Sequence, residues 1–314
     1  MRIVILFMNQ LCLLCKVKSE NEMGGISGYS YCSKCRLGWK TQKTKIEYDT
    51  SYYVGKSGIA TKLFSPIAYF FYWIRKSYLG NKNYETWIDV GAGDGGFLET
   101  VKAKKRIGVE VSKSGRKLME HKGLSTLSDK KFLGSRNLNS DVISFWHVLE
   151  HVENPLEYLK TAKRNLRKKG RIIIGVPNID SLEFKVFKKF WFHLVPDFHL
   201  WHYSSKSLEL FLKKSGFQVE YVDNWSIEHN PTGIIQSFIN WSAHSDSVLH
   251  RLIKRGMDYK LSIKDIFWSG FWLTIGLPVV FFFWLTGVLF KMPGTFVVVA
   301  VPYEVKSKTR VSLR

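Results

Sequence analysis

A glycine-rich loop that carries two acidic residues is the part of the sequence with the clearest chemistry. Residues 86–101 read TWIDVGAGDGGFLETV, which predicts a short apolar strand at 87–90, a tight turn and a helix that begins near Phe97. Glycine tolerates left-handed backbone angles and lets a ligand approach the main-chain N–H groups at a helix N-terminus. The loop is therefore predicted to bind a nucleotide-like ligand; a plain glycine turn without a ligand is the alternative.

The acids of this loop distinguish between two ligand classes. A dinucleotide-binding loop has the spacing G-x-G-x-x-G and holds a pyrophosphate at the helix N-terminus. Here Asp89 precedes Gly91 and Gly93, and Asp94 follows them. These carboxylates would repel a pyrophosphate. They suit a ligand that has an ammonium group and no phosphate, which describes S-adenosylmethionine.

Acidic residues also follow the strands predicted next along the chain. Glu110 lies at the end of the predicted strand 106–111, about 20 residues after the loop, where an acid can accept hydrogen bonds from two ribose hydroxyls. A less regular strand at 124–128 is followed by Asp129, which in a doubly wound sheet could approach the adenine amino group. Both positions agree with an adenosine-containing ligand.

Four cysteines form a second candidate site. Cys12 and Cys15 are one C-x2-C pair, Cys32 and Cys35 are another, and 16 residues separate the pairs. This spacing is typical of two knuckles that close one tetrahedral zinc site. Four thiolates leave no position for water, so the predicted zinc is structural. Four unrelated buried cysteines and a redox pair are the alternatives, although no βαβ pattern surrounds the cysteines.

Strands and helices alternate after residue 84, which predicts an α/β protein with a doubly wound, Rossmann-like sheet. The apolar runs predict strands at 87–90, 106–111, 124–128, 142–145, 171–177, 217–222 and 295–302. Helices are predicted at 114–121, at 156–167 and between Ser204 and Gly216. In such sheets ligands bind beyond the carboxyl ends of the strands.

Three motifs resemble one known family. The run WHVLEHVENP at 146–155, the run RIIIGVPN at 171–178 and the segment WFHLVPDFHLWHYS at 191–204 are similar to motifs of class I S-adenosylmethionine-dependent methyltransferases. The resemblance covers roughly residues 84–224 and 294–304. One departure concerns the third motif, because Asp197 and Phe198 occupy the place where the group usually has an arginine.

The resemblance implies a seven-stranded sheet with an antiparallel last strand. It also implies cofactor contacts from Asp89, Gly91, Gly93, Glu110, Asp129 and His147. The catalytic base does not carry over, because acceptors differ within the group. His199 and His202 are the candidates, since histidine titrates near neutral pH; packing of the loop is their alternative role. His147 and His151 lie four residues apart, so a metal pair is conceivable, although hydrogen bonding at a helix start is favoured.

The motifs suggest four regions and two special segments. The regions are a zinc ribbon at 1–40, a linker with an amphipathic cover helix at 41–83, a methyltransferase domain at 84–304 and a basic tail at 305–314. Within the domain, residues 229–256 are predicted to roof the acceptor site, and residues 264–291 to form a hydrophobic helical hairpin.

The hairpin is predicted from an apolar run. Residues 266–290 carry no charge, a length that permits one membrane-spanning helix. The strand predicted at 295–302 joins the same sheet as the strand before the run, so both ends of the run must emerge on one side. Gly276 and Pro278 divide it into two short helices. A hairpin that enters one leaflet fits these facts; a buried helix pair or a dimer interface is the alternative.

The formal net charge of +21 implies a partner with a negative surface, either anionic lipid or nucleic acid. Basic residues flank the apolar run, which favours lipid: Arg251, Lys254, Arg255, Lys260 and Lys264 precede it, and Lys291, Lys306, Lys308, Arg310 and Arg314 follow it. Residues 1–11 resemble a weak signal peptide but lack a small-residue cleavage site. The predicted location is therefore cytoplasmic, peripheral or monotopic at the inner membrane face.

The sequence thus predicts a methyltransferase that uses S-adenosylmethionine and a structural zinc. It is expected to transfer the methyl group to oxygen, on a small, amphipathic or lipid-linked acceptor at the membrane face. An RNA methyltransferase that grips phosphates with its zinc ribbon and basic surface is the main alternative. A non-catalytic scaffold that only binds the cofactor is the third.

Overall fold

The computed structural model describes residues 5–7, 11–19, 21–44, 59–80, 82–225, 230–245 and 262–303. Several sequence expectations lie outside the described residues. These are most of the linker between the ribbon and the cover helix, the second half of the predicted roof, the basic tail, and all the flanking cations except Lys264 and Lys291.

Seven strands form the main sheet, in the order β12-β13-β10-β9-β6-β7-β8. Their bounds are β6 Tyr84–Val90, β7 Ala103–Val109, β8 Ser125–Leu127, β9 Ser140–Trp146, β10 Leu166–Pro177, β12 Phe217–Asp223 and β13 Thr295–Pro302. The strands from β8 to β10 pair in parallel, whereas β13 is antiparallel to both of its neighbours. The predicted Rossmann-like sheet with an antiparallel last strand is confirmed.

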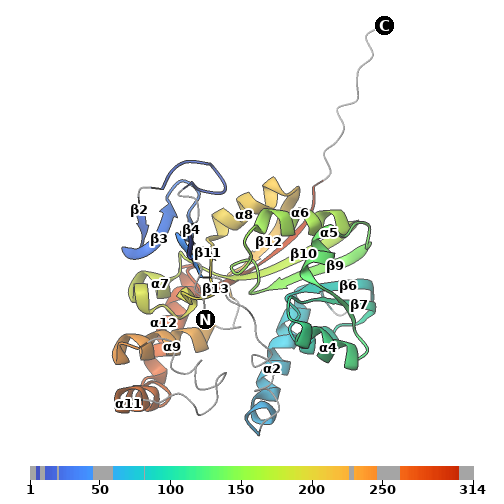
Figure 1. Ribbon diagram of the computed structural model, residues 1–314. Helices are drawn as coiled ribbons and strands as arrows, with labels where there is room; N and C mark the ends of the chain where they lie inside the picture. Colours follow the sequence, from blue (N-terminus) through green and yellow to red (C-terminus); the bar gives the residue numbers. More distant parts are fainter. Residues whose placement is uncertain are drawn as a thin grey trace.

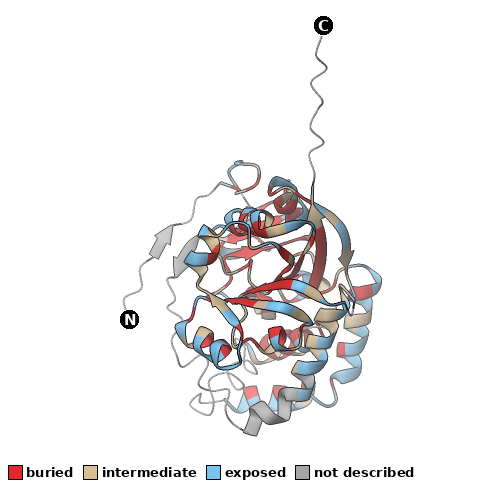
Figure 2. Cartoon of the chain, turned by 90° about the vertical axis from the view of Figure 1, so that its right-hand side faces the viewer, coloured by how far each residue is buried: buried red, intermediate tan, exposed pale blue. Residues whose placement is uncertain are grey.

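Helices cover both faces of this sheet (Figure 1). The helices α5 Asp129–Gly134, α6 Pro155–Asn165 and α8 Ser205–Lys214 contribute to the core on one face. The helices α2 Ile59–Ser77, α3 Gly96–Glu99 and α4 Lys113–His121 pack on the other. Much of the sheet is buried, as the red strands of Figure 2 show. Because both faces of the strands are covered, β10 can carry an unbroken apolar run, and Ile172, Ile173 and Ile174 are all buried.

Local signals explain where the helices begin and end. Ser204 and Ser207 form a reciprocal capping box at the start of α8, and Gly216, with φ of 84°, follows its end. The side chain of Asn154 accepts from the N–H of Glu157 at the start of α6. The α6 helix ends two residues earlier than predicted, because Leu166 already pairs with β9 as the first residue of β10.

The cysteine-containing segment forms a separate sheet, which includes one strand from a much later part of the chain. Its order is β11-β4-β3-β2, where β2 is Asn21–Met23, β3 is Ile26–Cys32, β4 is Leu37–Lys40 and β11 is Trp201–His202. In the β11–β4 pair, Trp201 lies opposite Trp39. The sequence did not predict this pairing. Two further short strands, β1 Ile5–Phe7 and β5 Gln42–Thr44, pair with each other.

A second apolar cluster lies between the ribbon sheet and the last helices. It involves α7 Leu182–Phe187, α9 Asn230–Ala243, α11 Ile263–Trp272 and α12 Leu277–Leu289. Phe238 of α9 stacks on Trp272 of α11 with ring centroids 4.1 Å apart, and lies 5.5 Å from the ring of Phe283. Both α11 and α12 are therefore anchored to α9 on one side.

The predicted division of the apolar run is confirmed. The α11 helix ends at Trp272, α12 begins at Leu277 with Pro278 in its first turn, and the two axes differ by 67°. Among the described residues no single helix is long and apolar enough to cross a membrane, and only this bent pair meets the length and composition test together.

Gly38 tests how tightly the ribbon sheet packs on the rest of the molecule. A Cβ at this position would collide with Met23 Sδ and lie 2.8 Å from Ile179 Cδ1. Gly38→Ala should therefore lower the free energy of unfolding by about 1–3 kcal/mol, the usual cost of overpacking. The control is Gly134→Ala, where no described atom lies within 4 Å of the new Cβ. Equal urea midpoints for Gly38→Ala and the unsubstituted protein would contradict the packing described here.

Candidate active site

The glycine loop follows β6 at the carboxyl end of the sheet. Gly91, Gly93 and Gly95 all have positive φ, at 75°, 61° and 80°. The N–H of Gly91 donates to the carbonyl of Val109, which ties the loop to β7. A Cβ at Gly91 would collide with Val148, whereas no described atom lies within 4 Å of a Cβ built at Gly93. The loop is therefore packed on one side and open on the other, where a ligand could approach.

Asp89 lies one residue before the end of β6 and is buried. Its Oδ1 accepts a hydrogen bond of 2.6 Å from the hydroxyl of Ser144 on β9. Burial raises the pKa of Asp89 to about 7, although Ser144 and the charge of Arg75 act in the opposite direction. A buried carboxylate at this position favours a cationic group beside it.

Glu110 directly follows β7, and its side chain contacts the glycine loop. Its Oε2 accepts from the N–H of Gly93 at 3.0 Å, and its Oε1 accepts from the N–H of Ser112 at 2.8 Å. Each carboxylate oxygen can accept more than one hydrogen bond. Glu110 can thus order the loop and still accept from a ligand hydroxyl.

The other three predicted cofactor residues have different surroundings. Asp94 Oδ1 accepts from the N–H of Gly96 at the start of α3. Asp129 is the first residue of α5. Burial raises the pKa of Tyr158, and a hydrogen bond with Asp129 raises it further. His147 follows β9 with φ of 55°, in the left-handed region that few non-glycine residues adopt. Glu110 thus contacts the glycine loop and lies close enough to Asp89 for their charges to interact, whereas Asp129 contacts Tyr158 on α6.

The cover helix α2 contributes two residues that sequence reasoning missed. The guanidinium carbon of Arg75 lies 4.9 Å from the ring centroid of Trp146 and 5.6 Å from that of Phe97. The hydroxyl of Tyr72 lies 2.8 Å from the position of a Cβ on Gly96. The sequence does place a cation, Arg75, in the last turn of an amphipathic helix. Its spacing does not indicate that Arg75 faces the glycine loop.

His199 and His202 are both buried, on either side of Trp201. The ring centroid of His202 lies 5.6 Å from that of Tyr29 in the ribbon and 5.8 Å from that of Trp191. Burial lowers the pKa of His202 to about 3 and places that of His199 well below its usual value. Both rings are therefore neutral at physiological pH. Their role as a catalytic base stays a prediction.

The four cysteines lie together as the spacing predicts. One sulfur from each of Cys12, Cys15, Cys32 and Cys35 lies within 4.8 Å of the others, and the Cys15 and Cys32 sulfurs are 3.6 Å apart. Three of the four residues are buried. Four thiols converging in this way fit a tetrahedral zinc ion, which would be held in a closed, structural site.

A buried acid, Glu183, lies at the start of α7. Glu183 Oε1 accepts from the Ser237 hydroxyl at 2.8 Å, and its Oε2 has no hydrogen-bond partner among the described residues. A Cβ on Gly294 would collide with Oε2, and a Cβ on Gly233 would lie 2.9 Å from His193 Nε2. Burial raises the pKa of Glu183 to about 8. No motif in the sequence marks this residue.

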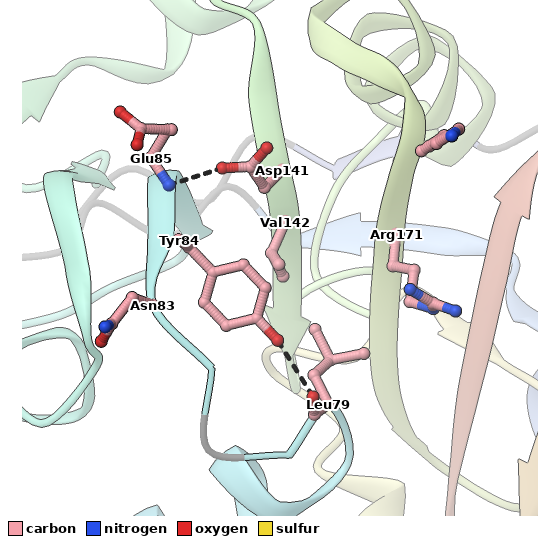
Figure 3. A pocket seen from close by; sticks show the side chains of 8 residues that line it. Leu79, Asn83, Tyr84, Glu85, Asp141, Val142 and Arg171 are labelled. Atoms are coloured by element: carbon pink, nitrogen blue, oxygen red, sulfur yellow. Dashed lines mark hydrogen bonds between the residues drawn. The ribbon is translucent and has the colours of Figure 1, made fainter.

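A cavity of about 240 Å³ lies at the opposite end of the sheet (Figure 3). It is lined by residues at the amino ends of β6, β9 and β10, including Tyr84, Asp141 and Arg171. The Tyr84 hydroxyl donates to the Leu79 carbonyl, and Arg171 makes two hydrogen bonds to Glu220. Ligands of doubly wound sheets bind at the carboxyl ends. This cavity is therefore not the candidate active site.

Glu183 should make stability depend on pH. Its pKa of about 8 in the folded state exceeds the ordinary value of 4.5, so the folded chain keeps a proton that the unfolded chain loses between these values. The free energy of unfolding should therefore fall as pH rises through this window, by up to about 1.4 kcal/mol per pH unit from this group. Glu183→Gln should flatten the fall between pH 6 and pH 8 in urea titrations.

The exposed Glu209→Gln is the control for this measurement, because it removes one acid without touching the buried cluster. A Glu183→Gln protein whose stability falls with pH as steeply as that of the Glu209→Gln protein would show that Glu183 is not the source.

Comparisons with known proteins agree with this geometry. A family model described as a methyltransferase domain matches residues 59–222, which is just over half of the chain. Two uncharacterised proteins of Methanocaldococcus jannaschii are 33% identical over 103 residues and 31% identical over 109 residues. Each match covers 32% of this chain, with 49% of the first relative and 48% of the second. The chain thus spans about half the length of the curated relatives it matches.

One solved structure shares the fold across most of the chain. It is a chain of the complex between the Haloferax volcanii Trm112 methyltransferase activator and a methyltransferase. The TM-score is 0.52 and the identity is 15%, over 82% of this chain and 100% of that one. The family match, the sheet order and the acid-flanked glycine loop lead to one conclusion: the chain belongs to the class I S-adenosylmethionine-dependent methyltransferases.

Proposed function

We propose that this protein transfers a methyl group from S-adenosylmethionine to an amphipathic or lipid-linked acceptor at an anionic membrane surface on the cytoplasmic side. The observation that carries the proposal is the large apolar face that α11 and α12 expose beside the carboxyl end of the sheet. The bound cofactor would supply an activated methyl group, so the chain needs mainly to position the two reactants.

The described residues suit the parts of the cofactor. Glu110 would accept from the ribose hydroxyls, and the open side of Gly93 would admit the ligand to the main chain. Asp89 offers a carboxylate to the amino group. Arg75, which lies over Trp146 at the end of β9, offers a cation to the cofactor's carboxylate.

Transfer to oxygen is part of the proposal, because an acceptor hydroxyl releases a proton that the site must accept. His202 is the candidate base, since neither of its ring nitrogens has a hydrogen-bond partner among the described residues. Its lowered pKa keeps the ring neutral at physiological pH, so one ring nitrogen carries a lone pair, but the same shift makes that nitrogen a weak base.

The exposed face of the hairpin fits a lipid surface. Ile275 at the bend is 73% exposed and Phe282 on α12 is 64% exposed. Eight further apolar residues of the two helices and the bend are at least half or nearly half exposed: Ile263, Ile266, Phe267, Leu273, Leu277, Val279, Phe281 and Leu289. Soluble monomers rarely leave so continuous an apolar surface in water.

The charges beside this face are of the matching sign. Lys264 lies at the start of α11 and Lys291 follows α12, and the whole chain carries a net charge of +21. A cation near an anionic leaflet contributes about 1 kcal/mol. Full burial of a large apolar side chain contributes about 1.5–3 kcal/mol. Apolar insertion would therefore dominate, and the cations would add a preference for anionic lipid.

The hairpin is joined directly to the end of the sheet where the cofactor loop lies. The side chain of Asn178, just after β10, donates to the Pro293 carbonyl, and its N–H donates to the Gly294 carbonyl. Asn230, the first residue of α9, accepts from the N–H of Thr295 at 2.7 Å. An acceptor held at the lipid surface would thus lie beside the active end of the sheet.

The cofactor half of the proposal is tested at Glu110. Glu110→Gln should weaken S-adenosylmethionine binding by about tenfold to a hundredfold, since a hydrogen bond to a charged group contributes about 1.5–3 kcal/mol. Isothermal titration calorimetry measures this directly. The control is Glu99→Gln, an exposed acid on α3 that pairs with Lys122 instead. If Glu110→Gln binds S-adenosylmethionine as tightly as the unsubstituted protein, Glu110 does not contact the cofactor.

The membrane half is tested by vesicle flotation. The protein should float with vesicles of phosphatidylcholine mixed with phosphatidylglycerol. The double variant Ile275→Ser/Phe282→Ser should bind about a hundredfold more weakly, because two large apolar side chains no longer enter the lipid. The matched control, Val17→Ser/Leu118→Ser, changes two apolar residues that are exposed elsewhere.

The same proteins test the acceptor. With methyl-labelled S-adenosylmethionine and a total lipid extract, the unsubstituted protein and the control should label the lipid phase, and the hairpin variant should lose that labelling while it still binds the cofactor. A protein that neither floats nor labels lipid, or a hairpin variant that does both as well as the control, would contradict the proposal.

A further inference from the structure

Three side chains outside the cysteine cluster come together beside the cofactor loop. Glu150, His151 and His199 each offer one ligand atom, and these three atoms all lie within 4.8 Å of one another. Glu150 and His151 belong to the segment that follows β9, while His199 belongs to the segment that precedes β11. The two segments lie 47 or more positions apart in the sequence, so only the fold brings these side chains together.

The hydrogen bonds of the two histidines orient their rings for ligation. His151 Nδ1 lies 3.1 Å from the Phe198 carbonyl, and His199 Nδ1 lies 2.8 Å from the His193 carbonyl. A carbonyl only accepts, so each Nδ1 must be the protonated nitrogen. In a neutral imidazole the proton on Nδ1 leaves a lone pair on Nε2. A backbone carbonyl that fixes the ring in this way is the usual second contact of a metal-bound histidine.

The main chain around the three residues is held from both sides. The N–H groups of Leu200 and Trp201 both donate to the Glu150 carbonyl, at 2.7 and 3.2 Å. The Trp201 indole donates to the Val152 carbonyl, and the Tyr203 hydroxyl donates to the Leu149 carbonyl, each at 2.9 Å. The positions of the three side chains are therefore set by the fold before any ion binds.

The charge of Glu150 also favours a cation. Its carboxylate is completely buried, and His147 Nδ1 lies 3.3 Å from its Oε1. A buried carboxylate is stable only when a cation or several donors compensate its charge. His151 and His199 direct their N–H groups to carbonyls, so their Nε2 lone pairs and the Glu150 carboxylate can all be offered to one cation.

We propose that Glu150, His151 and His199 bind a divalent transition-metal ion, of the class that includes Mn²⁺, Co²⁺ and Zn²⁺. Two imidazoles and a carboxylate are a donor set that these ions accept, and three protein ligands leave coordination positions for water or an acceptor oxygen. The site differs from the cysteine cluster, whose four sulfurs would close the coordination of their ion. It gives His199 a ligand role in place of the base role expected from the sequence.

The location gives such an ion access to the reaction. Val148, two residues before Glu150, packs against Gly91 of the cofactor loop, and His147 stacks on His193 with ring centroids 6.5 Å apart. The ion would thus lie between the cofactor loop and the segment 191–204. The binding of the ion can be measured without any methyl transfer, so its test stands apart from that of the proposed function.

Manganese is the first probe, because this hard ion disfavours thiolates and leaves the cysteine cluster to zinc. The zinc-loaded full chain is titrated with Mn²⁺ and the free ion is followed by electron paramagnetic resonance. The protein should bind one Mn²⁺. Glu150→Gln and His151→Gln should each weaken this binding at least tenfold, and the control His121→Gln, an exposed histidine on α4, should leave it unchanged.

Cobalt provides a second readout that identifies the ligands. Co²⁺ in this site should give weak visible bands without the intense near-ultraviolet charge transfer of thiolate ligation, and His199→Gln should abolish them. Near-ultraviolet circular dichroism checks that each variant is folded. If Glu150→Gln does not fold, the test rests on His151→Gln, which changes a partly exposed residue. The proposal is overturned if neither ion binds beyond the zinc, if folded variants bind as tightly as the control, or if Cys15→Ser removes the Mn²⁺.

Discussion

The main-chain pairing of residues 198–203 holds the active end of this molecule together. On one side this segment supplies β11 to the ribbon sheet, where Trp201 lies opposite Trp39. On the other side its N–H groups at Leu200 and Trp201 donate to Glu150, in the segment after β9. Tyr203 bridges to Asn178 after β10. Because one short segment pairs in three directions, the ribbon, the cofactor strands and the start of α7 cannot move independently.

This arrangement buries an unusual number of ionisable groups at one end of the sheet. Asp89, Glu150, Glu183, His199 and His202 are all nearly inaccessible to water. Burial raises the pKa of Asp89 and Glu183 and lowers that of both histidines, so each group is pushed toward its neutral form. Burying ionisable groups lowers the stability of the fold. Such groups are typically found at functional sites, where a bound ligand or ion can compensate the cost of burial. The opposite end of the sheet, where Arg171 pairs with Glu220 on the surface, shows no comparable burial among the described residues.

The features that could be predicted from the sequence were local ones. The glycine loop, the spacing of the cysteines and the break at Gly276 and Pro278 each depend on backbone chemistry within a few residues, and the structure contains all of them. The features that could not be predicted depend on contacts between distant segments. Nothing in the spacing indicates that Trp201 pairs with Trp39, that Arg75 covers Trp146, or that His199 reaches Glu150. Asp129 is an example: its position after β8 could be predicted from the sequence, whereas its contact with Tyr158 on α6 could not.

The hairpin shows how the topology of the sheet limits the ways in which this chain could meet a membrane. The α9 helix, which precedes the hairpin in the chain, and the strand β13, which follows it, are joined by the hydrogen bond from the N–H of Thr295 to the Asn230 side chain. On its inner side the hairpin is fixed by the stack of Phe238 on Trp272, and the Trp272 indole donates to Ser242 of α9. In the proposed orientation only the outer side of α11 and α12 could enter lipid, because deeper insertion would carry α9 and its polar residues with it. Since α9 also packs on the segment that contains Glu183 and Trp191, the proposed lipid-facing surface and the buried acids share one apolar core. A disturbance of the hairpin should therefore reach the active end through Phe238 and Phe187, whose rings lie 4.7 Å apart.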